Sequence, residues 1–328
     1  MSVDSPASRP LVSLEDVQAF YRVRKGFLGS RVVKAVDGVS LSIHEGEALA
    51  LVGESGCGKT TVGKLSIRLL KPSSGRILYD GVDITSLPEK SLQKLRRETR
   101  MIFQDPYSSI NPYITVGETV EEPLIAHKAG DKEERTETVY KALEEVRLTP
   151  PQDFAVKYPH LLSGGQRQRV AIARAIVLKP RYIVADEPVS MIDASSRAEV
   201  LEVLKRLQTS QGIAFLYISH DLATTRYFSD KIAVMYLGRV VEIGDVDEVL
   251  SEPLHPYTQG LIASIPEPDP ANRFVERPAI KGEPPSPFNI PKGCRFHPRC
   301  PKAFDRCMVE DPALREVGKN RYVACHLY

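Results

Sequence analysis

The stretch Gly53-Glu54-Ser55-Gly56-Cys57-Gly58-Lys59-Thr60 follows the apolar run Ala48–Val52 and precedes a helical pattern that ends near Leu70. It satisfies G-x-x-x-x-G-K-[ST] at every position, in the strand-loop-helix context that this motif requires. Glycines let backbone N–H groups surround phosphate oxygens, and the helix N-terminus adds a partial positive charge. We therefore expect the loop Gly53–Thr61 to bind ATP, with Lys59 on the β and γ phosphates and the Thr60 hydroxyl on Mg²⁺.

Two acids close a second apolar run, Tyr182–Ala185, and are followed by a proline. In a chain that has a phosphate loop, Asp186 at the end of a buried strand is expected to hold Mg²⁺, directly or through water. The next residue, Glu187, is expected to polarise the attacking water, as a base or as an orienting group. Taken alone, the same pattern also fits a strand that ends in a solvated acidic turn.

The stretch Leu162-Ser163-Gly164-Gly165-Gln166 opens a helical pattern that continues to Leu178. Serine is a preferred N-cap, and a helix N-terminus attracts anions. The chain therefore carries two predicted phosphate-binding helix ends, one at the phosphate loop and one at Ser163.

Strand-like and helical patterns alternate through the rest of the first 250 residues. The strand-like runs are Leu11–Tyr21, Val32–Ile43, Ile213–Ser219 and Lys231–Met235, and a helix is expected at about Ser195–Ser210. Such alternation predicts an α/β fold with a mostly parallel sheet. Together with the phosphate loop it resembles the P-loop NTPase fold, whose sheet is RecA-like. Residues from about 106 to 175 are mostly helical in pattern and predict an inserted α-helical subdomain.

Composition limits the possible functions and locations. The 328 residues carry a formal net charge of only +2, which argues against nucleic-acid binding by bulk electrostatics. No run approaches the roughly 20 apolar residues of a membrane span. The stretch Met1–Pro10 lacks the apolar core of a signal peptide. A cytosolic protein is expected, which would serve a membrane only by docking to a partner.

The chain changes in character beyond about residue 250, which predicts a nucleotide-binding domain at 1–250 and a separate C-terminal domain at 251–328. Proline is dense from Pro253 to Pro301, so we expect an extended linker without helices or central strands. Four cysteines crowd into the tail: Cys294, Cys300, Cys307 and Cys325. In a reduced compartment this clustering indicates metal rather than disulfides.

Together the three motifs resemble the nucleotide-binding subunits of ABC transporters, and the resemblance covers nearly the whole chain. It implies that two subunits face each other head to tail. The Ser163, Gly164, Gly165 and Gln166 end of one subunit then completes the phosphate loop of the other.

The same resemblance assigns roles to four further residues. Tyr21 matches the aromatic residue that stacks on adenine, with Phe20 as the less favoured choice. Gln104, in Met101-Ile102-Phe103-Gln104-Asp105, matches the glutamine that senses Mg²⁺ and the attacking water. Asp193 matches the D-loop aspartate, although Met191-Ile192 replaces the common Ala-Leu before it. His220 matches the switch histidine that contacts the γ-phosphate.

The C-terminal region is similar to that of the peptide-importing branch, on three stretches: His255-Pro256-Tyr257-Thr258-Gln259-Gly260-Leu261, Gly293–Pro301 and Val323–Tyr328. In that branch four cysteines hold a [4Fe–4S] cluster, and the cysteines here are spaced C-x5-C-x6-C-x17-C. The same thiols could bind Zn²⁺ instead, although C-x2-C knuckles are absent. A tail without metal is the remaining alternative.

The resemblance implies an ATPase subunit of an importer of dipeptides or oligopeptides, of the F type. Its partners would be a D-like second ATPase subunit, two transmembrane permease subunits and an extracytoplasmic substrate-binding protein, with no nucleic acid. It would lie peripherally at the cytoplasmic face of the membrane. Two alternatives stay open: an oligosaccharide importer of the same branch, and, more remotely, a soluble cassette ATPase acting on ribosomes or DNA.

Overall fold

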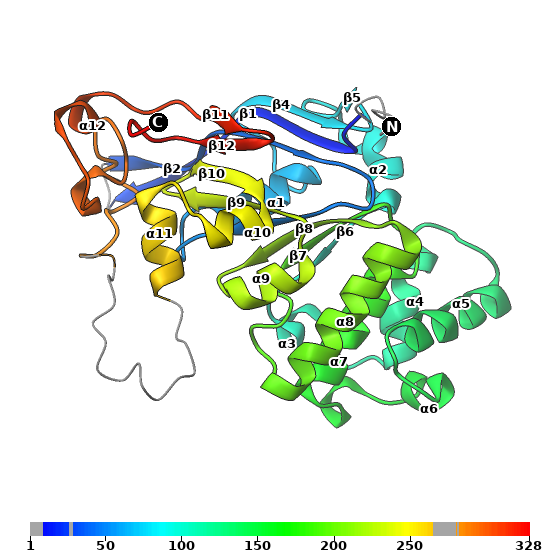
Figure 1. Ribbon diagram of the computed structural model, residues 1–328. Coiled ribbons are helices and arrows are strands. Elements are labelled where there is room, and N and C mark those ends of the chain that lie inside the picture. The colour runs from blue at the N-terminus through cyan, green and yellow to red at the C-terminus, as the bar shows by residue number, and fades with distance from the viewer. Residues whose placement is uncertain (1–8, 26–28, 265–279, 281) are drawn as a thin grey trace, which may run out of the picture. The chain divides into compact units, whose positions relative to one another are not determined.

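The computed structural model describes residues 9–25, 29–264, 280 and 282–328, and Figure 1 shows the order of the elements along the chain. The chain forms two compact units. The unit built from Val12–Ser42, Leu49–Leu78 and Ser219–Tyr328 is called the P-loop unit. The unit built from Ile43–Ala48, Tyr79–Ile218 and the start of the chain is called the helical unit. Most of the expected linker, at 265–279 and 281, lies outside the described residues.

The P-loop unit contains a sheet in which the order of strands is β11-β12-β10-β9-β3. Strands β3 (Ala48–Val52) and β9 (Lys231–Tyr236) are parallel, with Leu49 opposite Lys231. All five residues of β3 are buried, as an apolar run of this length predicts. This strand leads directly into the phosphate loop and helix α1 (Lys59–Ser66).

The remaining strands of this sheet are antiparallel. Strand β10 (Arg239–Asp245) pairs with β9 on one side and with β12 (Arg321–Val323) on the other, and β12 pairs with β11 (Arg315–Gly318). The expectation of a mostly parallel sheet is thus corrected to a mixed sheet. A tight turn connects β9 to β10, so these two strands are antiparallel. The C-terminal segment returns to the other edge of β10, where β12 pairs with it in the antiparallel direction.

A second sheet in the P-loop unit has the order β2-β1-β4. Its strands are β1 (Val12–Lys25), β2 (Gly29–Ile43) and β4 (Ser74–Tyr79). The other elements of this unit are short helices: α9 (Leu222–Phe228), α10 (Val246–Ser251), α11 (Pro256–Ala263), the 3-10 turn η4 (His297–Arg299) and α12 (Asp305–Val309).

The helical unit has a parallel core of strands in the order β8-β7-β6, namely β6 (Thr99–Ile102), β7 (Tyr182–Asp186) and β8 (Ala214–Ser219). Every residue of β7 and β8 is buried. The long helix α8 (Ala194–Gln211) connects β7 to β8, which is the crossover that parallel strands require. Before β6 lie the short elements β5 (Val82–Asp83), η1 (Glu89–Leu92) and α2 (Gln93–Glu98).

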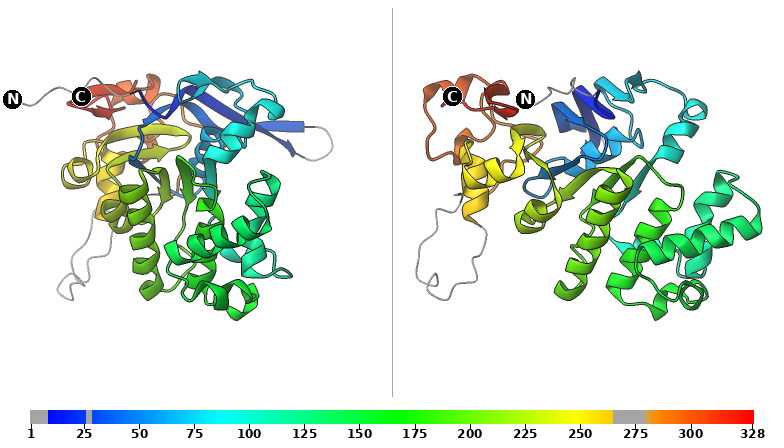
Figure 2. Two further views of the ribbon diagram at one scale, coloured as in Figure 1. Left: turned by 90° about the vertical axis from the view of Figure 1, so that its right-hand side faces the viewer. Right: turned by 45° about the vertical axis from the view of Figure 1, so that its right-hand side comes forward.

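Helices fill the part of this unit between β6 and β7. They are α3 (Pro106–Ser109), α4 (Val116–Ala126), α5 (Lys132–Glu145), α6 (Pro151–Ala155), the 3-10 turn η2 (Pro159–Leu161) and α7 (Gly164–Ile176). Helices α4 and α5 pack on each other and on α7, and α6 contacts α4 and α5 (Figure 2). The helical pattern expected here is therefore present, and helix α7 begins at the Ser-Gly-Gly end.

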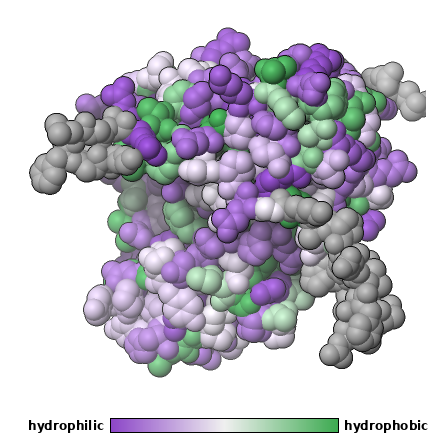
Figure 3. Space-filling view, turned by 90° about the vertical axis from the view of Figure 1, so that its left-hand side faces the viewer, coloured by the Kyte–Doolittle hydropathy of each residue, from purple (hydrophilic) through white to green (hydrophobic). Residues whose placement is uncertain are grey.

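Among the described residues, no helix is long and apolar enough to cross a bilayer. On the face shown in Figure 3, hydrophobic residues form small patches that hydrophilic residues separate.

Helix α11 contradicts the expectation that the proline-dense stretch forms no helix. Pro256 occupies the first turn, where its missing N–H costs nothing and its fixed φ suits a helix. The imidazole Nδ1 of His255 caps the helix by accepting a hydrogen bond from the N–H of Tyr257 at 3.0 Å. A proline at the start of a helix was thus mistaken for a helix breaker.

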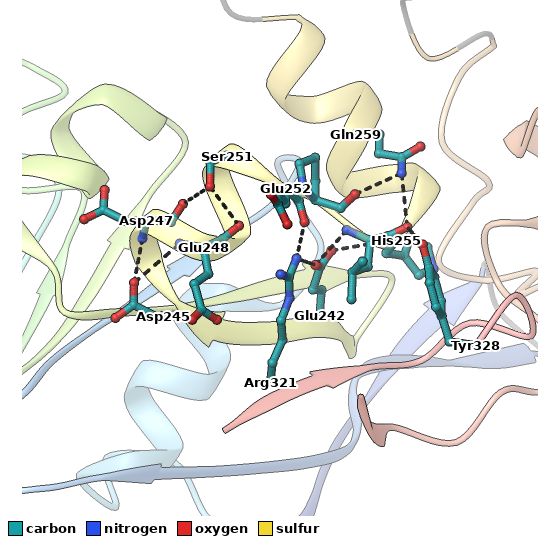
Figure 4. A network of polar contacts seen from close by, with 12 residues as sticks. Glu242, Asp245, Asp247, Glu248, Ser251, Glu252, His255, Gln259, Arg321 and Tyr328 are labelled. Atoms are coloured by element: carbon teal, nitrogen blue, oxygen red, sulfur yellow. Dashed lines mark hydrogen bonds and ion pairs between the residues drawn. The ribbon is translucent and has the colours of Figure 1, made fainter. Parts of the chain in front are cut away.

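A buried carboxylate ties the C-terminal strand to the start of α11 (Figure 4). Glu242 of β10 is fully buried and accepts hydrogen bonds from the N–H groups of Leu254 and His255, at 2.9 and 3.0 Å. Arg321 of β12 forms an ion pair with it at 3.1 Å and also donates to the carbonyl oxygen of Glu252. The charge of Glu242 is therefore compensated from three directions.

The Arg321→Met substitution should lower the free energy of unfolding by about 3 kcal/mol, because it leaves a buried carboxylate without its counter-charge. Urea unfolding followed by circular dichroism measures the change. Arg306→Met is the matched control, since it breaks an exposed ion pair with Glu310 and should cost less than about 1 kcal/mol. Equal losses in the two variants would contradict the role of the buried pair.

Burial lowers the pKa of His255 to about 3, below its ordinary value of 6.5. Below about pH 6.5 the unfolded chain binds a proton that the folded chain does not, so the stability contributed by this residue is lost as the pH falls. The loss approaches about 1.4 kcal/mol per pH unit. Urea unfolding at about pH 7 and pH 5 should show a weaker pH dependence for His255→Asn than for the wild type. Parallel pH profiles would rule this out.

Candidate nucleotide-binding site

The phosphate loop adopts a backbone that only glycine allows at two positions. Gly58 caps α1 with a φ of 108°, and a Cβ atom there would lie 2.1 Å from the carbonyl oxygen of Ala35. At Gly53 a Cβ atom would lie 2.2 Å from the carbonyl oxygen of Met235. The neighbouring backbone therefore encloses the loop closely on two sides, which explains the two outer glycines of the motif.

The side chain of Lys59 folds back over the loop. It is 7% exposed, and its Nζ donates to the carbonyl oxygens of Gly53 at 2.7 Å and Glu54 at 3.1 Å. The ammonium group and the start of α1 thus place positive charge at the same loop, as an anion site requires. Thr60, in the first turn of α1, is exposed, whereas the Cys57 side chain is buried and its pKa is raised by that burial.

The helical unit brings two predicted catalytic residues together. The Nε2 of Gln104, just after β6, donates to the Oε2 of Glu187 at 2.7 Å. Glu187 has a φ of +46°, and its N–H donates to the carbonyl oxygen of Ile218 at 2.9 Å. The preceding Asp186 ends β7 and is 6% exposed. The backbone thus leaves the extended conformation of the strand at Glu187, directly after Asp186.

Ser163 caps helix α7, as the sequence predicts. Its Oγ accepts a hydrogen bond from the N–H of Gln166 at 3.2 Å, and the Gln166 side chain accepts one from the N–H of Ser163 at 3.1 Å. This reciprocal pair is a capping box. The amide of Gln166 is therefore engaged in shaping the helix end, while Ser163 itself is exposed.

The start of α7 lies close to the start of α8. A Cβ atom at Gly165 would lie 2.6 Å from the Cβ of Ser196, so only glycine permits this approach. Asp193 caps α8 by accepting from the N–H of Ser196 at 2.9 Å, and it also accepts from the Ser195 hydroxyl. These hydrogen bonds, that of Ser195 foremost, lower the pKa of Asp193 to about 2. The Ser163-Gly164-Gly165 end of α7 and the D-loop residue Asp193 at the start of α8 are thus neighbours in one unit.

The remaining predicted residues belong to the P-loop unit. Tyr21 lies on β1 and is 40% exposed. The ring of its neighbour Phe20 lies 5.4 Å from the Nζ of Lys34, a cation–π contact. Exposure therefore favours Tyr21 over Phe20 as the aromatic residue available for stacking. His220 directly follows β8 and is exposed.

The four tail cysteines share one small region but do not form a metal site in this structure. Burial raises the pKa of Cys294 to about 11, and it also raises the pKa values of Cys300 and Cys325. Among the described residues, which include all four cysteines, no three His, Cys, Asp or Glu side chains are placed to hold an ion. The structure therefore supports neither the expected [4Fe–4S] cluster nor zinc.

Two residues that contact the phosphate loop were not predicted. The carboxylate of Glu54 pairs with Arg299, and the N–H of Glu54 donates to the phenol oxygen of Tyr257. The sequence offered a signal, because both residues lie in the C-terminal stretches that carry the resemblance to the peptide branch. The motifs in those stretches do not indicate, however, that the stretches contact the phosphate loop in the folded chain.

Comparisons with known proteins identify the family of this chain. Residues 36–190 match the family described as "ABC transporter", and residues 241–307 match "Oligopeptide/dipeptide transporter, C-terminal region". The oligopeptide transport ATP-binding protein AppF of Bacillus subtilis is 46% identical over 97% of both chains. The putative oligopeptide transport ATP-binding protein YkfD of the same species is 47% identical over 97% of this chain and 96% of its own length.

Solved structures show the same fold. The ATP-binding cassette MJ0796, in a dimeric post-hydrolysis state bound to ADP and Pi, is 32% identical with a TM-score of 0.64, and the match covers 72% of this chain and 98% of that one. The cassette cbiO1 of Clostridium perfringens is 29% identical with the same TM-score, over 75% and 92% of the two chains. The chain therefore belongs to the ABC transporter family, in the branch whose ATP-binding proteins carry the oligopeptide/dipeptide transporter C-terminal region.

Proposed function

We propose that the chain is the ATP-hydrolysing subunit of an ABC importer that takes up dipeptides or oligopeptides. The observation that carries the ATPase assignment is the phosphate loop, with buried Lys59 folded over it at the start of α1. The peptide assignment rests on the match of residues 241–307 and on relatives named as oligopeptide transport proteins. The division into a nucleotide-binding domain at 1–250 and a C-terminal domain at 251–328 is part of this proposal.

In this proposal the loop Gly53–Thr61 binds the phosphates, and Tyr21 stacks on the adenine. Thr60, Asp186 and Gln104 would hold Mg²⁺, because this ion prefers oxygen donors and is usually bound by one or two carboxylates together with phosphate oxygens and water. Bound there, it would neutralise charge on the phosphates. The chain's own contribution is the ammonium of Lys59, which moves from loop carbonyls to phosphate oxygens.

Glu187 is proposed to orient and polarise the attacking water, and Gln104 to hold the Glu187 carboxylate in place through the 2.7 Å hydrogen bond. His220 is proposed to contact the γ-phosphate. A carboxylate on a strained turn after a rigid strand keeps a defined direction, which suits a group that must aim one water molecule at one phosphorus atom.

A second ATPase subunit is proposed to complete the site. The exposed Ser163, with Gly164, Gly165, Gln166 and the D-loop residue Asp193, would face the phosphate loop of that subunit. An F-like chain would pair with a D-like homologue, and two permease subunits and an extracytoplasmic substrate-binding protein would complete the transporter. The chain would then lie at the cytoplasmic face of the membrane. The dimeric state of MJ0796 is consistent with such pairing.

Glu187→Gln should retain ATP binding while hydrolysis by the assembled transporter falls about 10²- to 10⁴-fold, because the carboxylate that polarises water is lost. Equilibrium binding of ATP and release of phosphate are the measurements. Glu133→Gln, which changes an exposed acid in the first turn of α5, is the matched control and should leave both unchanged. Hydrolysis at the wild-type rate in Glu187→Gln would remove the role given to this residue.

The cargo can be tested by deleting the gene and measuring uptake of labelled peptides of two to six residues or so and of labelled oligosaccharides. We expect loss of peptide uptake, restored by the wild-type gene and not by Glu187→Gln. Loss of oligosaccharide uptake with normal peptide uptake would support the sugar-importing alternative. Normal uptake of both, with a defect in translation or DNA repair, would support a soluble cassette ATPase.

A further inference from the structure

The C-terminal stretch Cys294–Cys300 packs against the phosphate loop within the P-loop unit. Phe296, at its centre, is 1% exposed and lies among three buried rings. Its ring centroid is 5.3 Å from that of Tyr236, 5.4 Å from Tyr257 and 5.8 Å from His255. Since β9 carries Tyr236 and the start of α11 carries the other two, the aromatic cluster fixes this stretch beside the end of β9.

Arg299 extends from this stretch to the loop. Its two terminal nitrogens donate to the two carboxylate oxygens of Glu54, at 2.9 and 3.0 Å, which is a bidentate pair. The side chain of Arg299 is 7% exposed and that of Glu54 is 25% exposed. Arg299 also donates to the hydroxyl of Tyr236 at 3.3 Å. The fork of the guanidinium therefore has a fixed direction.

Glu54 is held through its main chain as well. Its N–H donates to the phenol oxygen of Tyr257 at 2.9 Å, and its carbonyl oxygen accepts from Lys59 at 3.1 Å. The side chain, the N–H and the carbonyl of one loop residue are thus each engaged. The first two partners come from the C-terminal part of the chain, and the third is the lysine proposed to bind phosphate.

A second arginine reaches the same loop by another route. Arg295 pairs with Asp37 and donates to the carbonyl oxygen of Leu237, and both side chains of the pair are almost fully buried. The adjacent Gly238 accepts from the N–H of Asp37 at 2.9 Å and donates its own N–H to the carbonyl oxygen of Cys57 at 2.9 Å. Arg299 thus contacts the loop at Glu54, and Arg295 is linked to it at Cys57 through the turn at Leu237 and Gly238.

Burying an ion pair costs desolvation free energy that its attraction often only offsets, so stability alone is a weak reason for these pairs. A bidentate pair also fixes the relative orientation of the guanidinium and the carboxylate. We propose that Arg299 and Tyr257 are positioning residues of the phosphate loop, which hold Glu54 so that the loop backbone and Lys59 take the geometry that binds phosphate. This role rests on the proposed function, because it presupposes that the loop binds ATP.

The test measures the ATP dissociation constant of the full-length chain and the KM and kcat of the assembled transporter. Arg299→Met should weaken ATP binding and raise KM about tenfold, because the bidentate pair that positions Glu54 is lost, with kcat at saturating ATP within about twofold. Glu54→Gln and Tyr257→Phe should change KM in the same direction. Arg299→Lys, which keeps the charge and loses the fork, should fall between Arg299→Met and the wild type.

Arg306→Met is the matched control, because it removes an exposed arginine from the same C-terminal region and should leave ATP binding unchanged. The double variant Arg299→Met/Glu54→Gln should have an ATP dissociation constant no higher than that of the single variant that binds ATP less tightly. The reason is that both changes break the same interaction. Losses that add in full would show independent effects and overturn the proposal.

Normal ATP binding by Arg299→Met, even with a lower melting temperature, would show a merely structural role and overturn the proposal. If Arg299→Met does not fold, Glu54→Gln and Tyr257→Phe decide in its place, and normal binding by both overturns it. A wild-type chain that binds no ATP would refute the proposed function itself, which is a different result from normal binding by the variants.

Discussion

The hydrogen bonds from Lys59 to the carbonyl oxygens of Gly53 and Glu54 are the interaction on which the site depends. They hold the loop backbone around the buried ammonium group of Lys59. The positive charge of that group therefore lies inside the loop. The closure is possible because β3 delivers the chain in a fixed direction and because Gly58 starts α1 at a φ that other residues avoid. The direction of β3, the backbone conformation at Gly58 and the hydrogen bonds of Lys59 therefore together determine the shape of the phosphate loop.

Sequence patterns correctly predicted those strands and helix ends that depend on interactions between residues close together in the chain. The buried runs became β3, β7 and β8, and the Ser163 cap started α7, because burial and capping act on neighbouring residues. Helix α11 was missed because one proline has opposite meanings at the first turn and inside a helix. The mixed sheet was not predicted for two reasons. No strand was predicted at β10, which pairs antiparallel with β9 through a tight turn, and the pairing of β10 with β12 joins distant segments.

The same distinction applies to the site. Motifs identified Glu187 and Gln104 separately, and the fold brings the two side chains within hydrogen-bonding distance. The pair Arg299–Glu54 joins residues 245 positions apart, so no local pattern contains it. The cysteine tail is a different case. Four cysteines in a short tail predict a metal site, but ligation needs three or more donors that converge on one point. Spacing along the chain does not determine convergence, and among the described residues no such group of donors is found.

Three ion pairs anchor the C-terminal region to the rest of its unit: the buried pairs Glu242–Arg321 and Asp37–Arg295, and the partly buried pair Glu54–Arg299. A proline-rich segment with few apolar residues cannot build a large core of its own, so aromatic contacts at Phe296 and directional polar contacts take that place. Hydrophobic contacts tolerate small shifts, whereas a bidentate pair does not. Ion pairs of this kind therefore fix the position of the C-terminal region relative to the residues that it contacts. Two of the three pairs reach the phosphate loop or the turn beside it, so the C-terminal region contacts the loop directly through polar groups.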